Sequence, residues 1–598
     1  MNKQDLIQKL KQLDGLTVDE KAALIELVKT KKKYGLVWED KPEAVEDQLR
    51  QYLPVLKEVT EKRILAKNIT QPENAASKLF KEENTLNHAA PNHILVEGDN
   101  LHALTALSFT HEGQIDLIYI DPPYNTGNKD FKYNDTFVDK EDTFRHSKWL
   151  SFMEKRLKIA KTLLSEKGTI FISIDDNELA QLKMLCDEVF NEDNFIEYFS
   201  WTKTSTPPGL SKKSRKTVEY ILCYEKQKNS LKYQGDLIDG GDAPLLNTGN
   251  NKRDLIFPKD KIQFRITDGF YKAGAYEKVI LKNDLVIKNG AADQDITLNG
   301  EFKWTQATTD KEIENGTYFI VKSDKFSIRF QRADIDSFKS PTNQIKDNIT
   351  SPTINKNEQG VETNEQATSE ILNILGVPFF DYPKPVSLIK YFIGFFQNKD
   401  LKILDFFAGS GTTLHATMLL NSEDNGNRQC ILVTNNENKI CEEVTYERNK
   451  RIIEGYTSSK GDRIKGLFNN NLRYYRSEFV SSTKNEINKR LLTQASTELL
   501  QIKENCYTDI TEANGFDLNQ CGIFTNDLGK YMIAVYHSRN QPAVCEELIS
   551  YVSNLQTEQR VKLYAFSPEK ETLAADFAEV ADKIEALPLP DAIYNAYR

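Results

Sequence analysis

The sequence predicts an α/β protein with a mixed, mostly parallel sheet. Three short apolar runs lead into aspartates at 93–100, 115–125 and 169–176. The segment 148–164 lies between the second and third runs, and its apolar residues recur at helical spacing. Continuous apolar strands that alternate with helices are typical of a parallel sheet covered by helices. The same pattern returns at 381–437, so we expect one sheet domain that is divided in sequence.

The aspartates at the strand ends are the first candidate functional residues. In open parallel sheets, ligands bind beyond the carboxyl ends of the strands. Asp99, Asp121 and Asp175 follow the three runs directly. We therefore expect these carboxylates to lie along one edge of the sheet, beside a binding crevice.

Composition excludes several classes of protein, but it does not identify a binding partner. The chain has 598 residues, with 78 basic and 88 acidic side chains and a net charge of −10. No apolar run approaches the roughly 18 residues that a membrane span needs. The first ten residues lack the apolar core of a signal peptide, so we expect a cytoplasmic protein. Seven cysteines without CxxC spacing predict neither a metal site nor a disulfide framework.

Three further regions flank or interrupt the sheet domain. Residues 1–90 read as a helical N-terminal arm, because Leu6, Leu10 and Leu13 recur at helical spacing and Thr17–Glu20 fits a capping box. The polar stretch 340–370 reads as a long linker. An acidic region after about residue 460 shows a strand-helix-strand pattern.

Local charge gives the first indication of a nucleic-acid partner. Residues 201–360 hold 26 basic and 21 acidic side chains, a net of +5, so the remainder carries −15. Their short alternating stretches predict an inserted α+β domain. The run Ser211–Lys216 and Arg253, Arg265, Arg329 and Arg332 are candidates for phosphate or base contacts. A solvated charged face is the alternative interpretation for any one of them.

The first chemical motif is Asp121-Pro122-Pro123-Tyr124, directly after a predicted buried strand. Two prolines fix φ and remove two N–H donors, so the strand ends there. The turn presents a carboxylate, free carbonyl oxygens and an aromatic face together. It can hold a planar amino group through two accepted hydrogen bonds while the ring stacks on the tyrosine, which is worth about 1–3 kcal/mol per base. A rigid turn with an exposed tyrosine is the alternative.

The second motif is the glycine-rich turn that begins at Asp405. Gly409 and Gly411 allow a tight turn and close approach of a ligand, and the following helix offers free N–H groups. A dinucleotide fingerprint would need a third glycine where Leu414 stands, and no P-loop lysine follows. A nucleoside-type ligand without a pyrophosphate fits better. The next strand ends in Asn435, Asn436 and Glu437, where such folds bind ribose hydroxyls.

Together, these motifs resemble the amino-group DNA methyltransferases that use S-adenosylmethionine. The Asp-Pro-Pro-Tyr motif precedes the glycine-rich turn by about 280 residues, which is similar to the permuted subgroup with target recognition between the motifs. The stretches 34–43, 218–226, 382–392 and 431–438 resemble the modification subunit of type III restriction–modification systems. The resemblance implies a Rossmann-like methyltransferase fold and methylation of adenine N6, because serine replaces the aspartate in cytosine-specific relatives.

The resemblance also implies residue roles. Asp121 and the Pro122 carbonyl would accept hydrogen bonds from a flipped base, beside Pro123, and Tyr124 would stack on it. For the cofactor S-adenosylmethionine, the resemblance implies a pocket lined by Phe407, Gly409 and Gly411. Asp405 would lie on the methionyl amine side, Glu437 would bind the ribose, and Asp99 would lie near the adenine. Lys384 belongs to the segment 383–385, which would close over the methionyl tail. Asn435 and Asn436 stay open as alternatives for the ribose.

The resemblance implies boundaries and partners as well. The expected divisions are a helical arm over 1–90, a catalytic domain split into 91–226 and 370–460, a target-recognition domain over 227–369, and an α/β assembly domain over 461–598. Implied partners are double-stranded DNA, a second copy of the chain and an ATP-dependent restriction subunit. The alternatives are an orphan adenine methyltransferase, a DNA-binding specificity subunit with an inactive fold, and a nucleotide-cofactor oxidoreductase.

Overall fold

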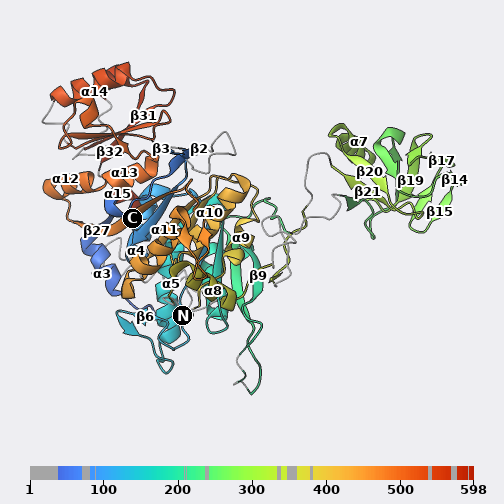
Figure 1. Ribbon diagram of the computed structural model, residues 1–598, viewed down its shortest axis with the longest axis horizontal. Coiled ribbons are helices and arrows are strands. Elements are labelled where there is room, and N and C mark those ends of the chain that lie inside the picture. Colours follow the sequence, from blue (N-terminus) through green and yellow to red (C-terminus); the bar gives the residue numbers. More distant parts are fainter. Residues whose placement is uncertain are drawn as a thin grey trace, which may run out of the picture.

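The computed structural model describes residues 38–70, 81–87, 89–207, 209, 212–235, 242–332, 338–345, 360–377, 382–536, 542–566, 575–589 and 591–597. A large body holds the main sheet, a lobe over 242–332 stands apart from it, and a smaller lobe packs at the C-terminal end (Figure 1). The expected helical spacing at Leu6, Leu10 and Leu13 and the capping box at Thr17–Glu20 lie outside the described residues.

The main sheet is mixed and mostly parallel, as the sequence predicts. Within the described residues its ten strands follow the order β1-β27-β4-β24-β23-β5-β8-β10-β9-β22. The strands from β27 to β8 run parallel, whereas β1 and β10 run antiparallel to their neighbours. Their bounds are β1 (Tyr52–Glu58), β27 (Asn471–Ser481), β4 (Asn92–Glu97), β24 (Gln429–Thr434), β23 (Lys402–Asp405), β5 (Ile115–Ile120), β8 (Leu164–Ile174), β10 (Val218–Glu225), β9 (Phe195–Thr202) and β22 (Gln344–Ile345).

Helices cover both faces of this sheet. Successive side chains of a strand point to opposite faces, so Ile118 and Ile120 of β5 join one core while Leu117 and Tyr119 join the other. The first core is covered by α4 (Asn100–His111), α5 (Arg145–Leu163) and α6 (Leu179–Phe190). The second is covered by α8 (Asn364–Leu375), α9 (Val386–Ile393), α10 (Thr412–Asp424) and α11 (Glu447–Glu454).

The topology reverses between β23 and β5. The chain leaves β23 through α10 to β24 on one side, and it leaves β5 through α5 to β8 on the other. The two strands pair in parallel, with Ile403 opposite Leu117 and Leu404 opposite Ile118. Such a reversal opens a crevice at the carboxyl ends of the two strands. The Asp121 turn and the glycine-rich turn therefore meet although about 280 residues separate them in sequence.

The first 90 residues differ from the expected helical arm. In their described part, α3 (Ala44–Gln51) is the α-helix, and it is followed by the sheet strand β1 and the hairpin strands β2 (Lys67–Thr70) and β3 (Lys81–Leu86). β1 buries Val55 and Leu56 against the body and pairs along its length with β27. The open edge of β27 thus draws this segment into a strand, because pairing satisfies backbone groups of both strands.

The C-terminal region contributes one strand to the main sheet and also forms a separate five-stranded sheet. β27, which follows the expected boundary at 460, pairs with β4 in the main sheet, so the sheet extends beyond that boundary. The helices α12 (Glu486–Ala495), α13 (Thr497–Glu504) and α15 (Asp591–Ala596) pack near this edge. The expected strand-helix-strand unit is present in a five-stranded sheet of β28 (Thr508–Asp509), β29 (Cys521–Thr525), β30 (Tyr531–Val535), β31 (Val561–Phe566) and β32 (Ile584–Leu589), with α14 (Pro542–Asn554) between β30 and β31.

The lobe over 242–332 has a core of its own, built around Phe257, Leu298 and Phe319. Its two ends lie side by side, because Ala243 pairs with Phe330. Its elements are β11 (Ala243–Pro244), β12 (Arg253–Phe257), β13 (Ile262–Phe264), β14 (Gly269–Tyr271), β15 (Gly274–Tyr276), β16 (Val279–Leu281), β17 (Leu285–Lys288), β18 (Ala291–Ala292), β19 (Ile296–Gly300), α7 (Gln306–Glu314), β20 (Tyr318–Val321) and β21 (Ile328–Gln331).

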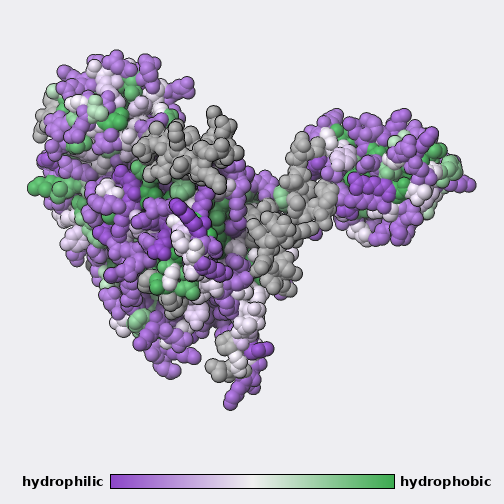
Figure 2. Space-filling view, in the orientation of Figure 1, coloured by the Kyte–Doolittle hydropathy of each residue, from purple (hydrophilic) through white to green (hydrophobic). Residues whose placement is uncertain are grey.

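Two small hairpins complete the described elements: β6 (Lys132–Tyr133) with β7 (Thr136–Phe137), and β25 (Tyr456–Thr457) with β26 (Arg463–Ile464). In the view of Figure 2, the surfaces of the body and of the separate lobe are mostly hydrophilic. None of the helices in the described ranges has the length and apolar content needed to cross a bilayer.

We expect residues 242–332 to fold when produced alone. The segment has its own apolar core, its ends already meet, and its visible surface is mostly hydrophilic. Thermal unfolding followed by circular dichroism should show one cooperative transition. Leu298→Ala should lower the unfolding free energy by about 2–5 kcal/mol, because Leu298 is fully buried. A segment without a cooperative transition would contradict the independence of this lobe.

Candidate functional site

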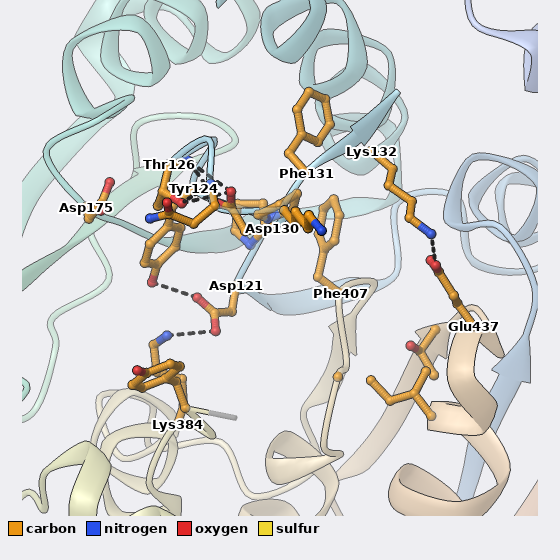
Figure 3. Close-up of a pocket in the computed structure, with 18 of the residues that line it drawn as sticks. Asp121, Tyr124, Thr126, Asp130, Phe131, Lys132, Asp175, Lys384, Phe407 and Glu437 are labelled. Carbon is orange, nitrogen blue, oxygen red and sulfur yellow. Dashed lines mark hydrogen bonds and ion pairs between the residues drawn. The ribbon is translucent and has the colours of Figure 1, made fainter. Parts of the chain in front are cut away.

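A cavity of about 1460 Å³ lies beyond the carboxyl ends of β5 and β23. Its wall is built by the turns after these strands, the β6–β7 hairpin, the start of β10, and the segments around Lys384 and Glu437 (Figure 3). The cavity is therefore at the crevice that the strand order predicts.

The turn after β5 holds Asp121 with both carboxylate oxygens engaged. The Tyr124 hydroxyl donates to Oδ1 at 2.8 Å, and the Lys384 ammonium donates to Oδ2 at 2.7 Å (Figure 3). The Trp149 indole donates a hydrogen bond to the Pro123 carbonyl at 2.7 Å and so helps to fix the turn. Burial, and then the charge of Asp121, raises the pKa of Tyr124 far above its ordinary value, so this hydroxyl stays protonated.

The residue after the turn is anchored in the protein. Asn125 adopts a left-handed backbone, with φ of 56°, and its side chain is buried. Its amide donates to the Glu178 carboxyl at 2.6 Å and to the Arg145 carbonyl at 3.2 Å. Burial raises the pKa of Glu178 to about 8. This anchor holds the end of the turn and so limits where the ring of Tyr124 can lie.

Glu219, at the start of β10, is a buried carboxylate that the motifs did not indicate. It accepts the Tyr124 hydroxyl at 3.1 Å and the Lys203 ammonium at 2.9 Å, and it lies 3.5 Å from the Lys384 ammonium. Burial alone would raise its pKa, but Lys384 and Lys203 outweigh burial and lower it. Burial alone would lower the pKa of Lys384, but Asp121 and Glu219 raise it. Two carboxylates and two ammonium groups thus form one buried network.

The glycine-rich turn after β23 is held by Asp405. This buried carboxylate accepts the Thr413 hydroxyl at 2.6 Å and the Phe407 amide at 3.0 Å. Burial raises its pKa to about 7, despite these two hydrogen bonds. Gly409 and Gly411 have φ of 48° and 75°. A Cβ at Gly411 would lie 2.4 Å from the Asn449 amide, so this position requires glycine on two grounds.

Asp99 also lines the cavity. It begins α4 and accepts the Leu101 amide at 2.7 Å. The buried Arg156 lies 3.6 Å from its carboxylate and donates to both oxygens of Glu43, at 3.0 and 3.1 Å. The Nη2 atom of Arg156 is buried and has no hydrogen-bond partner among the described residues. Phe152, under the Arg156 guanidinium, packs against Phe407 with ring centroids 5.9 Å apart.

Glu437 closes the cavity at its rim. Its carboxylate is paired with Lys132 of the β6–β7 hairpin (Figure 3). Its side chain is 45% exposed, compared with 36% for Asp99 and 28% for Asp121. Thr434 and Asn435, just before it, also line the cavity, whereas the Asn436 amide donates to Glu97 at 3.2 Å. Thr434, Asn435, Glu437 and Asn438 are therefore the polar residues of this segment that line the cavity.

The structure brings most of the expected site residues to this cavity. Asp99, Asp121, Pro122, Pro123, Tyr124, Lys384, Phe407, Gly409 and Glu437 line it. Asp405 and Gly411 lie behind the wall and shape the turn. Lys384 differs from the expectation, because its side chain reaches Asp121, while its carbonyl accepts the Thr412 hydroxyl at 3.2 Å. Asp175 also lines the cavity.

Sequence reasoning missed Glu219, Lys203, Arg156 and Glu43. Glu219 carries a weak signal, since it is a charged residue at the start of an otherwise apolar strand. Arg156 lies in the helix α5, and an arginine on a helix is ordinarily exposed to solvent, so its burial could not be foreseen from the sequence. No residue pattern links either side chain to its partners, which are distant in sequence.

The basic candidates divide into two groups. Arg215 and Lys216 of the 211–216 run line the cavity rim, and Lys216 pairs with Asp176 at 2.7 Å. In the separate lobe, Arg329 pairs with Asp242 at 2.7 Å, and Arg332 pairs with Glu312. These two arginines thus serve the lobe internally. Across the described residues, no group of three or more His, Cys, Asp or Glu side chains has the arrangement of a metal site.

Fold and cavity together define a class: an α/β protein that binds a nucleoside-type ligand at a strand-order reversal, next to a polar, aromatic turn. The DNA methylase family model matches residues 115–458, which covers more than half of the chain. The chain belongs to the DNA methylase family.

Individual relatives agree with this assignment. The StyLTI Mod subunit, a type III restriction-modification enzyme of Salmonella typhimurium, is 33% identical over 379 residues, covering 59% of this chain and 54% of that protein. This chain thus spans about half the length of that relative. The type II methyltransferase M.KpnI of Klebsiella pneumoniae is 32% identical over 382 residues, covering 62% of this chain and 87% of that protein.

Solved structures overlap more weakly. The PvuII DNA methyltransferase (cytosine-N4-specific) is 12% identical, and the overlap covers 60% of this chain and 88% of that chain with a TM-score of 0.30. That score is too low to support a functional argument.

Asp405→Asn should change how stability depends on pH. The unfolded aspartate has a pKa near 3.8 and the folded one near 7, so between these values the native state holds more protons. This group therefore makes the unfolding free energy fall as the pH rises through that window. We expect urea titrations at pH 5 and pH 7.5 to show a smaller fall for the variant than for the wild type. Equal falls in both proteins would contradict a buried, proton-holding Asp405.

Arg156→Met should destabilise the main sheet body by about 3 kcal/mol, because it leaves the buried Glu43 with only the more distant Lys155 ammonium, 3.7 Å away, as an ion-pair partner. Lys158→Met is the matched control on the same helix. Lys158 is 61% exposed in a surface pair with Glu154, so its replacement should cost less than about 1 kcal/mol. Chemical denaturation measures both. Similar small losses in the two variants would show that the Arg156–Glu43 pair does not hold this wall.

Proposed function

We propose that this chain is a DNA methyltransferase that transfers a methyl group from S-adenosylmethionine to adenine N6, acting in the cytoplasm as the modification and DNA-recognition subunit of a type III restriction–modification system. The observation that carries the proposal is the Asp121–Tyr124 turn, held at the strand-order reversal and facing the glycine-rich turn across one cavity. Family membership and the names of relatives such as the StyLTI Mod subunit support it.

The cavity wall fits S-adenosylmethionine at the end away from Asp121. Phe407 offers a flat apolar surface, Gly409 allows close approach of backbone, and Asp99 offers a carboxylate for an amino group. Asn435 and Glu437 are placed for ribose hydroxyls. When bound, the cofactor supplies an activated methyl group. Asp405 acts indirectly, because its two oxygens already hold the glycine-rich turn.

The turn at the other end suits an exocyclic amine. The lone pair of such an amine is shared with the ring, which makes it a poor nucleophile. Asp121 and the Pro122 carbonyl accept hydrogen bonds from its two N–H groups and draw these hydrogens out of the ring plane, which directs the lone pair toward the methyl donor. Holding reactants in such an orientation can contribute about 7–11 kcal/mol. Tyr124 stacks on the base, which must leave the duplex at a cost of a few kcal/mol.

DNA recognition falls to the separate lobe and the basic rim. The lobe is inserted between β10 and α8, and Arg215 and Lys216 stand at the mouth of the cavity. Arg253 and Arg265 are the lobe candidates for phosphates or bases, since Arg329 and Arg332 are paired internally. In the proposed assembly, two copies of the chain join an ATP-dependent restriction subunit.

A stand-alone adenine methyltransferase is the second candidate. It is favoured by the match that covers 87% of M.KpnI, a type II methyltransferase. Co-expression with the neighbouring genes and purification of the complex separates the two candidates: an ATPase that purifies with the chain supports the type III assembly.

Asp121→Ala should abolish methylation while leaving cofactor binding intact. The variant removes an acceptor for the amine without touching Phe407, Gly409 or Asp99, and losing one such preorganised contact costs on the order of 10²–10³-fold in rate. Transfer of tritiated methyl groups to DNA measures the rate, and calorimetric titration with S-adenosylmethionine measures binding. Methylation-sensitive sequencing of DNA from expressing cells identifies the base. Full activity of the variant, or methyl groups on cytosine, would overturn the proposal.

A further inference from the structure

Both acceptor oxygens of Asp121 are occupied in this structure. Tyr124 and Lys384 donate to them at 2.8 and 2.7 Å. Each oxygen keeps a second lone pair, but an ammonium group 2.7 Å from Oδ2 draws the carboxylate charge toward itself and so weakens Asp121 as an acceptor for a target amine. Lys384 is buried, with 7% of its side chain exposed, so water cannot easily receive its ammonium group. Leaving a buried charge without a partner costs several kcal/mol.

Glu219 is placed to receive both displaced donors. Its Oε2 atom lies 3.5 Å from the Lys384 ammonium and 3.1 Å from the Tyr124 hydroxyl. The hydroxyl has a single proton between two carboxylates, so it can bond to only one of them at a time. The other oxygen of Glu219, Oε1, is held by Lys203 at 2.9 Å. Glu219 therefore stays fixed in position, with Oε2 free to accept a donor released by Asp121.

We propose that Glu219 is a positioning residue that takes over the Lys384 ammonium when the target amine enters, and so frees Asp121 to orient that amine. The inference rests on the proposed function, and it adds a step to it. The exchange moves one ammonium group between two carboxylates in the same buried network, so no charge enters or leaves. Without Glu219, the ion pair with Lys384 keeps Asp121 a weakened acceptor for the amine.

Glu219→Gln should therefore slow methyl transfer rather than weaken binding. We expect the single-turnover rate at saturating DNA and cofactor to fall at least about tenfold, while the dissociation constants for both change less than about twofold. Glu225→Gln is the matched control, since Glu225 lies at the other end of β10, outside the cavity lining, and accepts the Asn229 amide at 2.7 Å. It should keep the wild-type rate.

A second variant separates this exchange from a merely structural role. In the Glu219→Gln/Lys384→Met protein no ammonium group draws charge away from Asp121, so its transfer rate should exceed that of Glu219→Gln alone. A purely structural Glu219 predicts that the double variant is as slow as the single variant or slower. A wild-type rate in Glu219→Gln, or a double variant no faster than it, overturns the inference.

A readout without catalysis keeps this test distinct from that of the proposed function. If the wild type transfers no methyl group, the proposed function has failed. The variants still test whether Glu219 holds Lys384: a double-mutant cycle of unfolding should show non-additivity of about tenfold in the unfolding equilibrium constant, as contacting groups do. Additive effects would overturn the ammonium exchange by themselves.

Discussion

The parallel pairing of β5 with β23 is the contact on which the site depends. It places the carboxyl ends of two strands from opposite ends of the catalytic sequence next to each other. From β5 the chain continues to one side of the sheet and from β23 to the other, so no connecting helix covers the gap between their ends. Both turns are locked by short local bonds: Trp149 holds the Pro123 carbonyl, and Asp405 holds Thr413. The cavity is thus a consequence of strand order.

The charges around this cavity are unusual for a protein interior. Glu219 and Lys384 are buried and Asp121 is half-buried, and buried ionised groups are stable only when they are paired. Replacing such a network with apolar residues is often neutral for stability, so its presence argues for a role in function. The network surrounds the one tyrosine hydroxyl of the turn, and it therefore fixes the ring against which a planar ligand can stack.

The sequence predicted what depends on local pattern. The strands around Asp99 and Asp121 have continuous apolar runs, and the turn residues Gly409 and Gly411 have positive φ where a tight turn needs it. What could not be predicted depends on distant partners. Lys384 lies 263 residues from Asp121, and Arg156 lies 113 residues from Glu43. The segment that forms β1 was expected to be helical. Its partner strand β27 lies more than 400 residues away, with Tyr52 opposite Ser481 and Glu58 opposite Tyr475, and this pairing leaves no periodic signal in either segment.

The separate lobe is attached to the part of the sheet that holds the substrate end of the cavity. The chain leaves the sheet after β10, which begins with Val218 and Glu219, and it returns through β22, where Gln344 pairs with Ser200 of β9. The next residue after β9 is Lys203, the partner of Glu219. Both stems of the lobe therefore join strands that carry the buried network. Under the proposed function, a DNA-reading lobe would be tethered to the residues around Asp121, whereas the part of the cavity wall around Asp99 and Phe407 is built from other strands.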